Sequence, residues 1–509
     1  MDRRGFFRIA LSSAGAAACL PSTAMAGATT RRQLAAGPYG SLDGRSPDEN
    51  GLLLPDGFTS RRVAVAGEPV AGTGYRWHVF PDGAATFDDG EGGWFYVCNS
   101  EVFIPDHAGG ASAIHFDAEG EVVDAYRILE DTTANCAGGP TPWGTWLSCE
   151  ERLDAQGQVW EVDPTGETPA QARPALGRWS HEAAAVDPDG EAVYLTEDDP
   201  GGKLYRFTPD AYPDLSAGVL EAAVVAPDAS VSWVTVPDPS AATTPVREQV
   251  PEATTFPGNE GIWYHAGTIV FTSKGDNRVH AIDIAAARYS QLWDGTSTDP
   301  LSGVDNITVA TASGDVFVAE DGGNMEVVLI TPDGDVVPFA RVAEPGHEGS
   351  EITGPAFSPD GTRLYFSSQR GPTPGTLTDI AGDRGVIGDT RNGWTTWEVT
   401  GPFRTVAAAG DRSTATTLAG AAEASGATTG DGDGNGSNGS DGGDGGDGGG
   451  SALPLAGGAV IALGAAGAGA WWLRTRRARP AGEPGLSGEA GSEDAVGATG
   501  PSGPGSDRA

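Results

Sequence analysis

The stretch Ala-Val-Tyr-Leu-Thr-Glu-Asp-Asp at residues 192–199 is an apolar run that ends abruptly in three acids. β-Branched and aromatic residues between polar turn clusters are typical of a strand. Similar runs with polar ends occur at 94–101, 144–151, 268–277, 315–321 and 363–370. The sixth run ends in Gln369 and Arg370 instead of an acid.

The spacing of these runs points to a repeat architecture. Four of the five intervals are about 45 to 50 residues, and the third is lengthened by an insertion around 211–250. A period of this length with several strands in each repeat is typical of propeller blades. The sequence therefore predicts an all-β fold, a six-bladed β-propeller over residues 38–405. A β-sandwich or two separate β domains are the alternatives.

A second polar mark precedes each apolar run, at the start of the strand before it. The marks are Asp82-Gly83, Asn135-Cys136, His181-Glu182, Asn259-Glu260, Asp305-Asn306 and Glu351. In a blade, the end of one strand and the start of its antiparallel neighbour lie at the same face. We therefore expect about a dozen of these positions to converge on one mouth of the axial channel.

Carboxylates gathered in a small space repel one another and take up protons unless cations are bound. Calcium favours six to eight oxygen ligands, whereas a thiolate such as that of Cys136 suits a transition metal, iron or zinc. The convergence therefore predicts a metal site. The alternative is that the acids are solvated turn residues and that Cys136 is a small buried apolar residue.

The overall charge excludes one class of partner. The chain has 509 residues and a formal net charge of −39. It offers no basic face to phosphates, so we expect no nucleic-acid partner. An acidic surface attracts cations instead.

Residues 1–26 have the pattern of a twin-arginine export signal, with Arg3 and Arg4, a small-residue apolar stretch and an Ala24-Met25-Ala26 cleavage site. An ordinary N-terminal amphipathic helix is the alternative. Cys19 leaves open a lipoprotein junction.

The C-terminal part predicts an anchor. Residues 406–451 are rich in Gly, Ser and Asp and form a predicted disordered stalk. Residues 452–473 contain no charged residue and are long enough to span a bilayer as a transmembrane helix, with a buried Ala/Gly-rich core helix as the alternative. The basic start of the 474–509 tail favours a cytoplasmic tail and a propeller at the cell surface.

The stretch at 135–151, Asn-Cys-Ala-Gly-Gly-Pro-Thr-Pro-Trp-Gly-Thr-Trp-Leu-Ser-Cys-Glu-Glu, closely resembles the PhoX family of exported bacterial alkaline phosphatases. Residues 177–182, 195–199 and 351–361 support the resemblance. It covers most of the body and neither the stalk nor the anchor. It implies a six-bladed propeller with an iron–calcium cluster in its channel and hydrolysis of phosphate monoesters, with diesters as a second substrate class.

The resemblance also implies site residues. Cys136 would be an iron ligand, with Glu182 and Glu260 as its carboxylate partners. The candidates for calcium would be Glu150, Glu197, Asp198 and Glu320.

Two departures from the family pattern concern the chemistry. Gly258 stands where the family has an arginine two residues before the glutamate that matches Glu260, and a forked guanidinium there would clamp phosphate. Ser100 stands where the family has His in its Asn-His-Glu motif. Arg178 and Arg370 are candidates to replace the missing phosphate-binding arginine.

Three functions follow from these patterns. The first is a metal-dependent phosphoesterase acting on a phosphate ester. The second is a non-catalytic, calcium-stabilised propeller that binds a cell-surface ligand. The third is a calcium-dependent hydrolase of another class, such as a lactonase. The Cys136 motif favours the first function and Gly258 favours the second.

Overall fold

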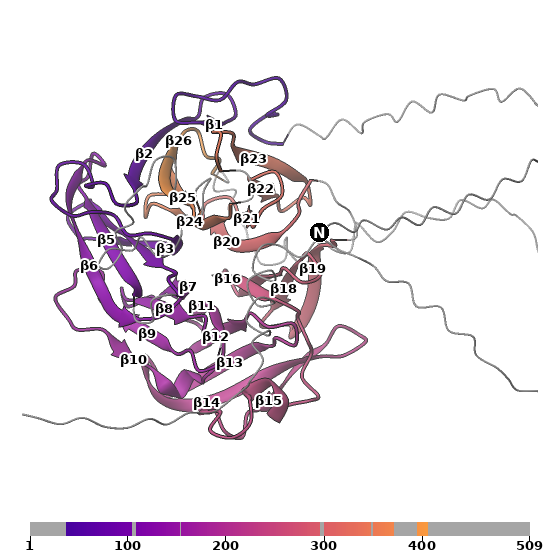
Figure 1. Cartoon of the computed structure of the whole chain (residues 1–509). Helices are drawn as coiled ribbons and strands as arrows, with labels where there is room; N and C mark the ends of the chain where they lie inside the picture. Colours follow the sequence, from indigo (N-terminus) through magenta and orange to yellow (C-terminus); the bar gives the residue numbers. More distant parts are fainter. Residues whose placement is uncertain are drawn as a thin grey trace, which may run out of the picture. The chain divides into compact units, whose positions relative to one another are not determined.

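The computed structural model describes residues 37–405, except 104–107, 153, 296–299, 348–349 and 371–393. These residues form six antiparallel sheets around an axis, and Figure 1 looks along that axis. The predicted six-bladed, all-β propeller is therefore confirmed. The predicted signal (1–26), stalk (406–451), transmembrane helix (452–473) and tail (474–509) lie outside the described residues. None of the helices in the described part is long and apolar enough to cross a membrane.

Each blade begins at the axis and its strands follow one another outward. Blade 1 contains β3 (Pro81–Asp88), β4 (Trp94–Ser100), β5 (Gly109–Phe116) and β6 (Val122–Thr132). Blade 2 contains β7 (Asn135–Pro140), β8 (Trp146–Glu150), β9 (Val159–Val162) and β10 (Gln171–Ala172). Blade 3 contains β11 (His181–Asp187), β12 (Ala192–Glu197), β13 (Leu204–Ala211), β14 (Asp214–Val225) and β15 (Val231–Thr235).

The second half of the ring repeats the arrangement. Blade 4 contains β16 (Asn259–His265), β17 (Thr268–Ser273), β18 (Arg278–Asp283) and β19 (Arg288–Trp293). Blade 5 contains β20 (Val304–Ala310), β21 (Asp315–Glu320), β22 (Glu326–Ile330), β23 (Val336–Val342) and the short β1 (Leu52–Leu53). Blade 6 contains β24 (Ile352–Phe357), β25 (Arg363–Ser368), β26 (Thr395–Thr400) and β2 (Thr59–Val65).

The predicted apolar runs are the second strands of the blades. β12, β17 and β21 are buried along their whole length, because each is covered by the neighbouring blades on both faces. This double burial explains why the runs read as continuously apolar instead of alternating.

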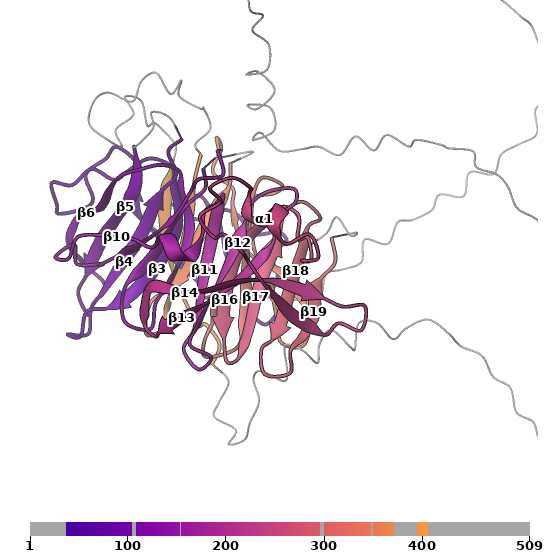
Figure 2. The ribbon, with the colours of Figure 1, turned by 90° about the horizontal axis from the view of Figure 1, so that it is seen from below.

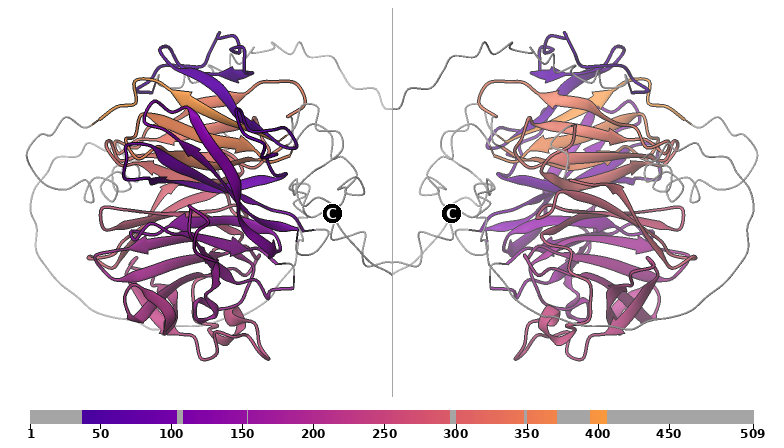
Figure 3. Two further views of the ribbon diagram at one scale, coloured as in Figure 1. Left: turned by 90° about the vertical axis from the view of Figure 1, so that its left-hand side faces the viewer. Right: turned by 90° about the vertical axis from the view of Figure 1, so that its right-hand side faces the viewer.

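Seven apolar clusters form the core of the described residues, and six of them lie one between each pair of neighbouring blades. Figure 3 shows the blades stacked against one another from two sides. Phe317 is fully buried between blades 5 and 6, and burial of such a side chain stabilises the fold by roughly 1.5–3 kcal/mol. Packing between blades, more than within them, therefore stabilises the ring.

The ring is closed by pairing the beginning of the body with its end. β2 pairs antiparallel with β26, with Thr59 opposite Thr400. Their hydroxyls hydrogen bond at 3.0 Å across 341 residues of chain. The pairing supplies the outermost strand of blade 6 from the beginning of the body and so holds the two ends of the ring together.

The predicted insertion lies in blade 3 and the connection after it. It includes the long β14, β15 and the helix α1 (Val246–Gln249). A short 3₁₀ helix, η1 (Pro174–Leu176), precedes β11. Both helices lie away from the axial strands (Figures 1 and 2).

Candidate metal centre

Each innermost strand carries a β-bulge, at an equivalent place in all six blades. In blade 1, for example, Pro81 pairs with Ser100 and Ala84 with Cys98, so two residues oppose one. The bulged pairs are Asp82-Gly83, Cys136-Ala137, Glu182-Ala183, Glu260-Gly261, Asp305-Asn306 and Gly354-Pro355. A bulge breaks the alternation of a strand and re-aims a side chain. In five blades the first bulged residue is an acid or Cys136.

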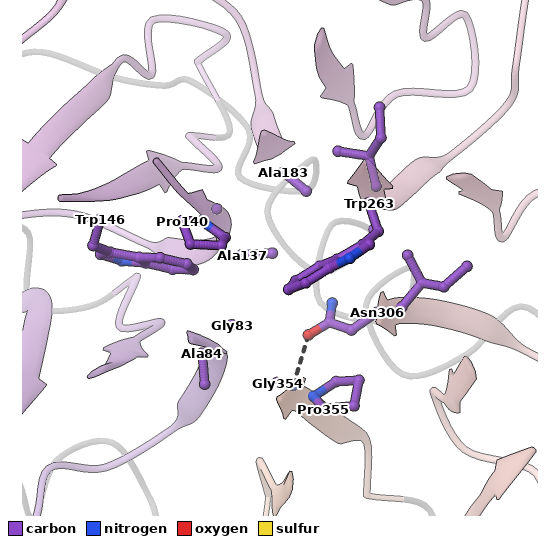
Figure 4. Close-up of a pocket in the computed structure, with 14 residues that line it drawn as sticks. Gly83, Ala84, Ala137, Pro140, Trp146, Ala183, Trp263, Asn306, Gly354 and Pro355 are labelled. Carbon is purple, nitrogen blue, oxygen red and sulfur yellow. Dashed lines mark hydrogen bonds between the residues drawn. The ribbon is translucent and has the colours of Figure 1, made fainter. Parts of the chain in front are cut away.

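The second bulged residue is small in four blades, and the innermost strands approach one another closely there. A Cβ added at Gly83 would lie 2.4 Å from the Cα of Ala137, and one added at Gly261 would lie 2.8 Å from the Cα of Asn306. These residues also line an axial cavity, in which Trp263 and Pro355 lie across from Trp146 and Pro140 (Figure 4).

The acids form one continuous cluster of four overlapping groups. In each group the ligand atoms lie within 4.8 Å of one another. The groups are Asp82/Glu101/Cys136, Cys136/Glu151/Glu182, Glu182/Glu260/Asp305 and Asp305/Asp321/Glu351. We call these residues the acid ring.

Glu182 is the clearest sign that the acid ring lacks a partner. Its side chain is 1% exposed, and neither carboxylate oxygen accepts a hydrogen bond from a nitrogen or oxygen of the described residues. Asp82 Oδ1 is also buried without such a partner. Buried carboxylates are normally hydrogen bonded, paired or bound to a metal. Carboxylates around one thiol fit calcium and a transition metal such as iron.

The electrostatics of the acid ring favour protonation in the absence of cations. Burial raises the pKa of Glu182 well above its usual value, and the carboxylates of Asp305 and Asp82 raise it further. Burial also raises the pKa values of Asp82, Glu151, Glu260 and Glu351. The pKa of the Cys136 thiol is raised by burial and then by Asp82 and Glu101. A bound metal would have to displace these protons.

Two cationic side chains enter the acid ring from the ends of second strands. Lys274 follows β17 and lies 2.8 Å from Asp305 Oδ2 and 3.2 Å from Asp321 Oδ2. Arg370 follows β25 and pairs with Glu351. Burial raises the pKa of Asp305 to about 6, although the Lys274 ammonium lowers it.

The structure brings together part of the predicted ligand set. Cys136, Glu182 and Glu260 all belong to the acid ring. Asp198 belongs to none of the four groups, but it lies beside Glu260. A Cβ added at Gly258 would be 3.4 Å from Asp198 Oδ1 and 3.7 Å from Glu260 Oε1.

Three predicted calcium candidates lie outside the four groups and have other partners. Glu150 accepts backbone N–H groups of Thr133 and Gln158, each at 3.2 Å. Glu197 accepts the Tyr205 hydroxyl at 2.7 Å and pairs with Arg247 at 2.8 Å.

Glu320, the third, accepts the N–H groups of Ser302 at 2.9 Å and Glu326 at 3.1 Å. The carboxylates of Glu150, Glu197 and Glu320 are therefore satisfied by the protein itself.

The two arginines that were candidates for phosphate binding have different partners. Arg370 contacts the acid ring through Glu351. Arg178 instead donates to Gln156 O and Gln158 Oε1, each at 3.3 Å. Gly258 has a left-handed φ of +58°, and its carbonyl accepts the N–H of Lys274 at 2.6 Å.

Several acid-ring residues were missing from the predicted ligand set. They are Asp82, Glu101, Glu151, Asp305, Asp321 and Glu351. The cation Lys274, which contacts the acid ring, was also missing. All of them lie in the polar marks or at the polar ends of the apolar runs. The signal that could have found them was therefore the repeat itself, applied to all six copies.

Fold and site together define a β-propeller with a buried, acid-lined axial site. The family model described as "Alkaline phosphatase PhoX" matches residues 100–292 and 268–375. The chain belongs to this family, whose members are phosphoric ester hydrolases.

Among solved structures, Pseudomonas fluorescens PhoX in complex with vanadate, a transition state analogue, matches with a TM-score of 0.56 and 17% identity. The match covers 69% of this chain and 96% of that chain. At this identity the likeness shows the fold alone.

Two more distant matches carry no argument, because their TM-scores are low. The gluconolactonase XC5397 of Xanthomonas campestris matches at 0.37 with 14% identity, over 68% of this chain and 89% of that chain. Regucalcin of Agrobacterium tumefaciens, a calcium-binding protein, matches with a TM-score of 0.32 and 16% identity, over 65% of this chain and 94% of that chain. A search of curated protein sequences found no significant match.

Proposed function

We propose that this protein is an exported, metal-dependent phosphoesterase that uses an iron–calcium cluster held by the acid ring. The observation that carries the proposal is the Glu182 carboxylate, which is buried beside the Cys136 thiol and accepts no hydrogen bond from a nitrogen or oxygen of the described residues. Membership in the PhoX family supports a phosphate ester as the substrate. Cys136, Glu182 and Glu260 are the ligands that we assign to iron, and other carboxylates of the acid ring would hold calcium.

The metals, when bound, act as Lewis acids on the phosphoryl group and neutralise its charge. The chain itself positions the ligands and supplies positive charge. The bulges fix Asp82, Cys136 and Glu182 at one level of the axis, so the ligands are preorganised. Lys274 and Arg370 have side chains that are 33% and 34% exposed, and they present positive charge to an arriving phosphate dianion. This charge opposes the repulsion between the dianion and the carboxylates.

Elemental analysis of the full chain tests the proposal. We expect iron and calcium in the parent protein, loss of iron in Cys136→Ala, and hydrolysis of p-nitrophenyl phosphate that falls at least about 100-fold with the iron. Thr141→Ala, outside the acid ring, is the control and should keep its metals. Calcium alone, unchanged in Cys136→Ala, would contradict the proposal.

A second candidate function has its own supporting observation. Gly258 provides no side chain to hold a phosphate, and this favours a calcium-stabilised propeller that binds a cell-surface ligand without catalysis. Metal content that is intact together with no hydrolysis of phosphate mono- or diesters would favour this alternative.

We also propose, from the sequence, that the protein is exported by the twin-arginine route and anchored at the cell surface. Arg3 and Arg4 support the route, and the uncharged stretch at 452–473 supports the anchor. Export of a folded protein suits a ligand set that only the closed ring assembles.

A further inference from the structure

The four groups of the acid ring differ in whether the protein supplies a cation to them. Two groups, Glu182/Glu260/Asp305 and Asp305/Asp321/Glu351, contain residues that already touch Lys274 or Arg370. The other two share Cys136, and none of their acids forms an ion pair with a described Lys, Arg or His. We call the first two the basic half and the last two the cysteine half.

Lys274 lies where a metal ion would lie in the basic half. Its ammonium is within 3.2 Å of three carboxylates, those of Glu260, Asp305 and Asp321. The contact to Glu260 is an ion pair without hydrogen-bond geometry, as expected for a charge placed centrally between acids. The three close carboxylates stabilise the positive charge of the ammonium.

Lys274 is also held in place by the backbone. Its N–H donates to Gly258 O at 2.6 Å, and the next N–H, of Gly275, donates to Pro257 O at 2.9 Å. Two successive hydrogen bonds fix the loop after β17 against the segment that leads into β16. These bonds fix the backbone from which the Lys274 side chain reaches the acids.

Arg370 completes the basic half. Its Nη2 donates to Glu351 Oε2 and lies 4.0 Å from Asp321 Oδ1, and its Nε donates to Gln369 Oε1 at 2.6 Å. Asp321 is thus shared between the two cations. Each candidate metal position of the basic half has a side-chain charge in contact with its ligands.

Among the described residues, the side chain that donates an N–H to the acids of the cysteine half is neutral, and the charge of Arg370 acts on Glu101 only from beyond ion-pair distance. The Gln369 amide donates to Asp82 Oδ2 and, at 2.6 Å, to Glu101 Oε2. An amide satisfies one oxygen of each acid but adds no charge. Glu182, whose oxygens accept no N–H or O–H of the described residues, lies where the two halves meet.

We propose that Lys274 and Arg370 replace calcium ions in the basic half, so that, beyond the iron ligands Cys136, Glu182 and Glu260, the acid ring takes up metal only in its cysteine half. The inference rests on the proposed function, because it assumes that the acid ring binds metal. It adds that this chain binds fewer metal ions than its carboxylates alone would allow, because Lys274 occupies a position that a metal ion would otherwise take.

The test compares metal content in the full chain after equilibration with calcium. Lys274→Met keeps the length of the side chain but removes the charge, and it should bind about one more calcium ion per chain than the parent. Lys274→Arg keeps the charge and should bind no more than the parent. The melting temperature of Lys274→Met should also depend more strongly on calcium than that of the parent.

A second pair of variants keeps the test decisive if Lys274→Met does not fold. Glu151→Gln removes an acid from the cysteine half and should lose metal. Asp321→Asn removes an acid from the basic half and should keep the metal content of the parent. Equal losses in both variants, or no extra calcium in a folded Lys274→Met, would overturn the inference. A parent protein without any metal would instead overturn the proposed function.

Discussion

At the scale of single residues, Glu182 is the side chain whose environment is least satisfied. It is buried in the acid ring, and no N–H or O–H group of the described residues donates a hydrogen bond to its carboxylate. Without a metal, this carboxyl group must either stay protonated or place an uncompensated charge in the interior. Its contribution to stability should therefore depend on pH.

We predict that Glu182→Gln stabilises the metal-free protein at pH 8. The folded pKa of Glu182 is raised above its unfolded value, so the unfolded state releases the proton first as the pH rises. The destabilisation caused by Glu182 is absent below the usual carboxyl pKa of about 4.3 and grows as the pH rises toward the folded pKa. Urea unfolding after chelation should give a gain of about 1–3 kcal/mol at pH 8 and little at pH 4.

Glu398→Gln is the matched control. Glu398 is as deeply buried, but it pairs with Arg61 and Arg363, each at 2.8 Å. Removing its charge takes away the nearest carboxylate of both arginines, so it should lower stability at pH 8. The same sign of effect in both variants would count against the interpretation of Glu182.

Adjacent acids show how far residue roles could be predicted. The sequence placed Glu150 and Glu151 together at the end of one strand, and we took Glu150 as the ligand. The structure puts Glu151 in the acid ring, whereas Glu150 accepts two backbone N–H groups. Neighbouring residues of a strand point to opposite sides, so the choice depends on a register that the sequence does not contain.

At the scale of elements, the decisive feature is the bulge repeated in the six innermost strands. The apolar runs predicted the second strands closely: the run at 268–277 contains β17, and the run at 363–370 contains β25. The polar marks located the starts of the innermost strands. No local pattern predicted the bulges, because they arise where strands of neighbouring blades meet at the axis.

The close contact between innermost strands makes Gly83 sensitive to substitution. Gly83→Ala places a methyl group 2.4 Å from the Cα of Ala137, so β3 and β7 must move apart. We expect a loss of about 1–3 kcal/mol in the free energy of unfolding. Gly74→Ala is the control, since nothing lies within 4 Å of its added Cβ. An unchanged denaturation midpoint in Gly83→Ala would show that the strands are not confined there.

At the scale of the whole molecule, the ligands of the acid ring come from all six blades. Asp82 belongs to the first blade and Glu351 to the start of the last. The site therefore exists only when the ring is complete. The family and the fold were predictable from the sequence, because the Cys136 motif and the repeat are local; the composition of the acid ring depends on closure.

Export should follow the twin-arginine signal. We predict that Arg3→Lys with Arg4→Lys retains the protein inside the cell, because this route requires both arginines. Fractionation and protease treatment of intact cells measure the outcome. The pair Arg31→Lys and Arg32→Lys, beyond the expected cleavage site, should leave export unchanged. Surface exposure of the first double variant would exclude this route.

The pairing of β2 with β26 has a consequence for the folding of this chain during its synthesis. β2 is among the first strands of the body to emerge, but its partner is synthesised 341 residues later, measured between Thr59 and Thr400. At about 5–20 residues per second, β2 waits on the order of 20–70 seconds with an unpaired edge. During that time it can pair with a neighbouring nascent chain, so the yield of folded protein should depend on a chaperone that binds the early strand.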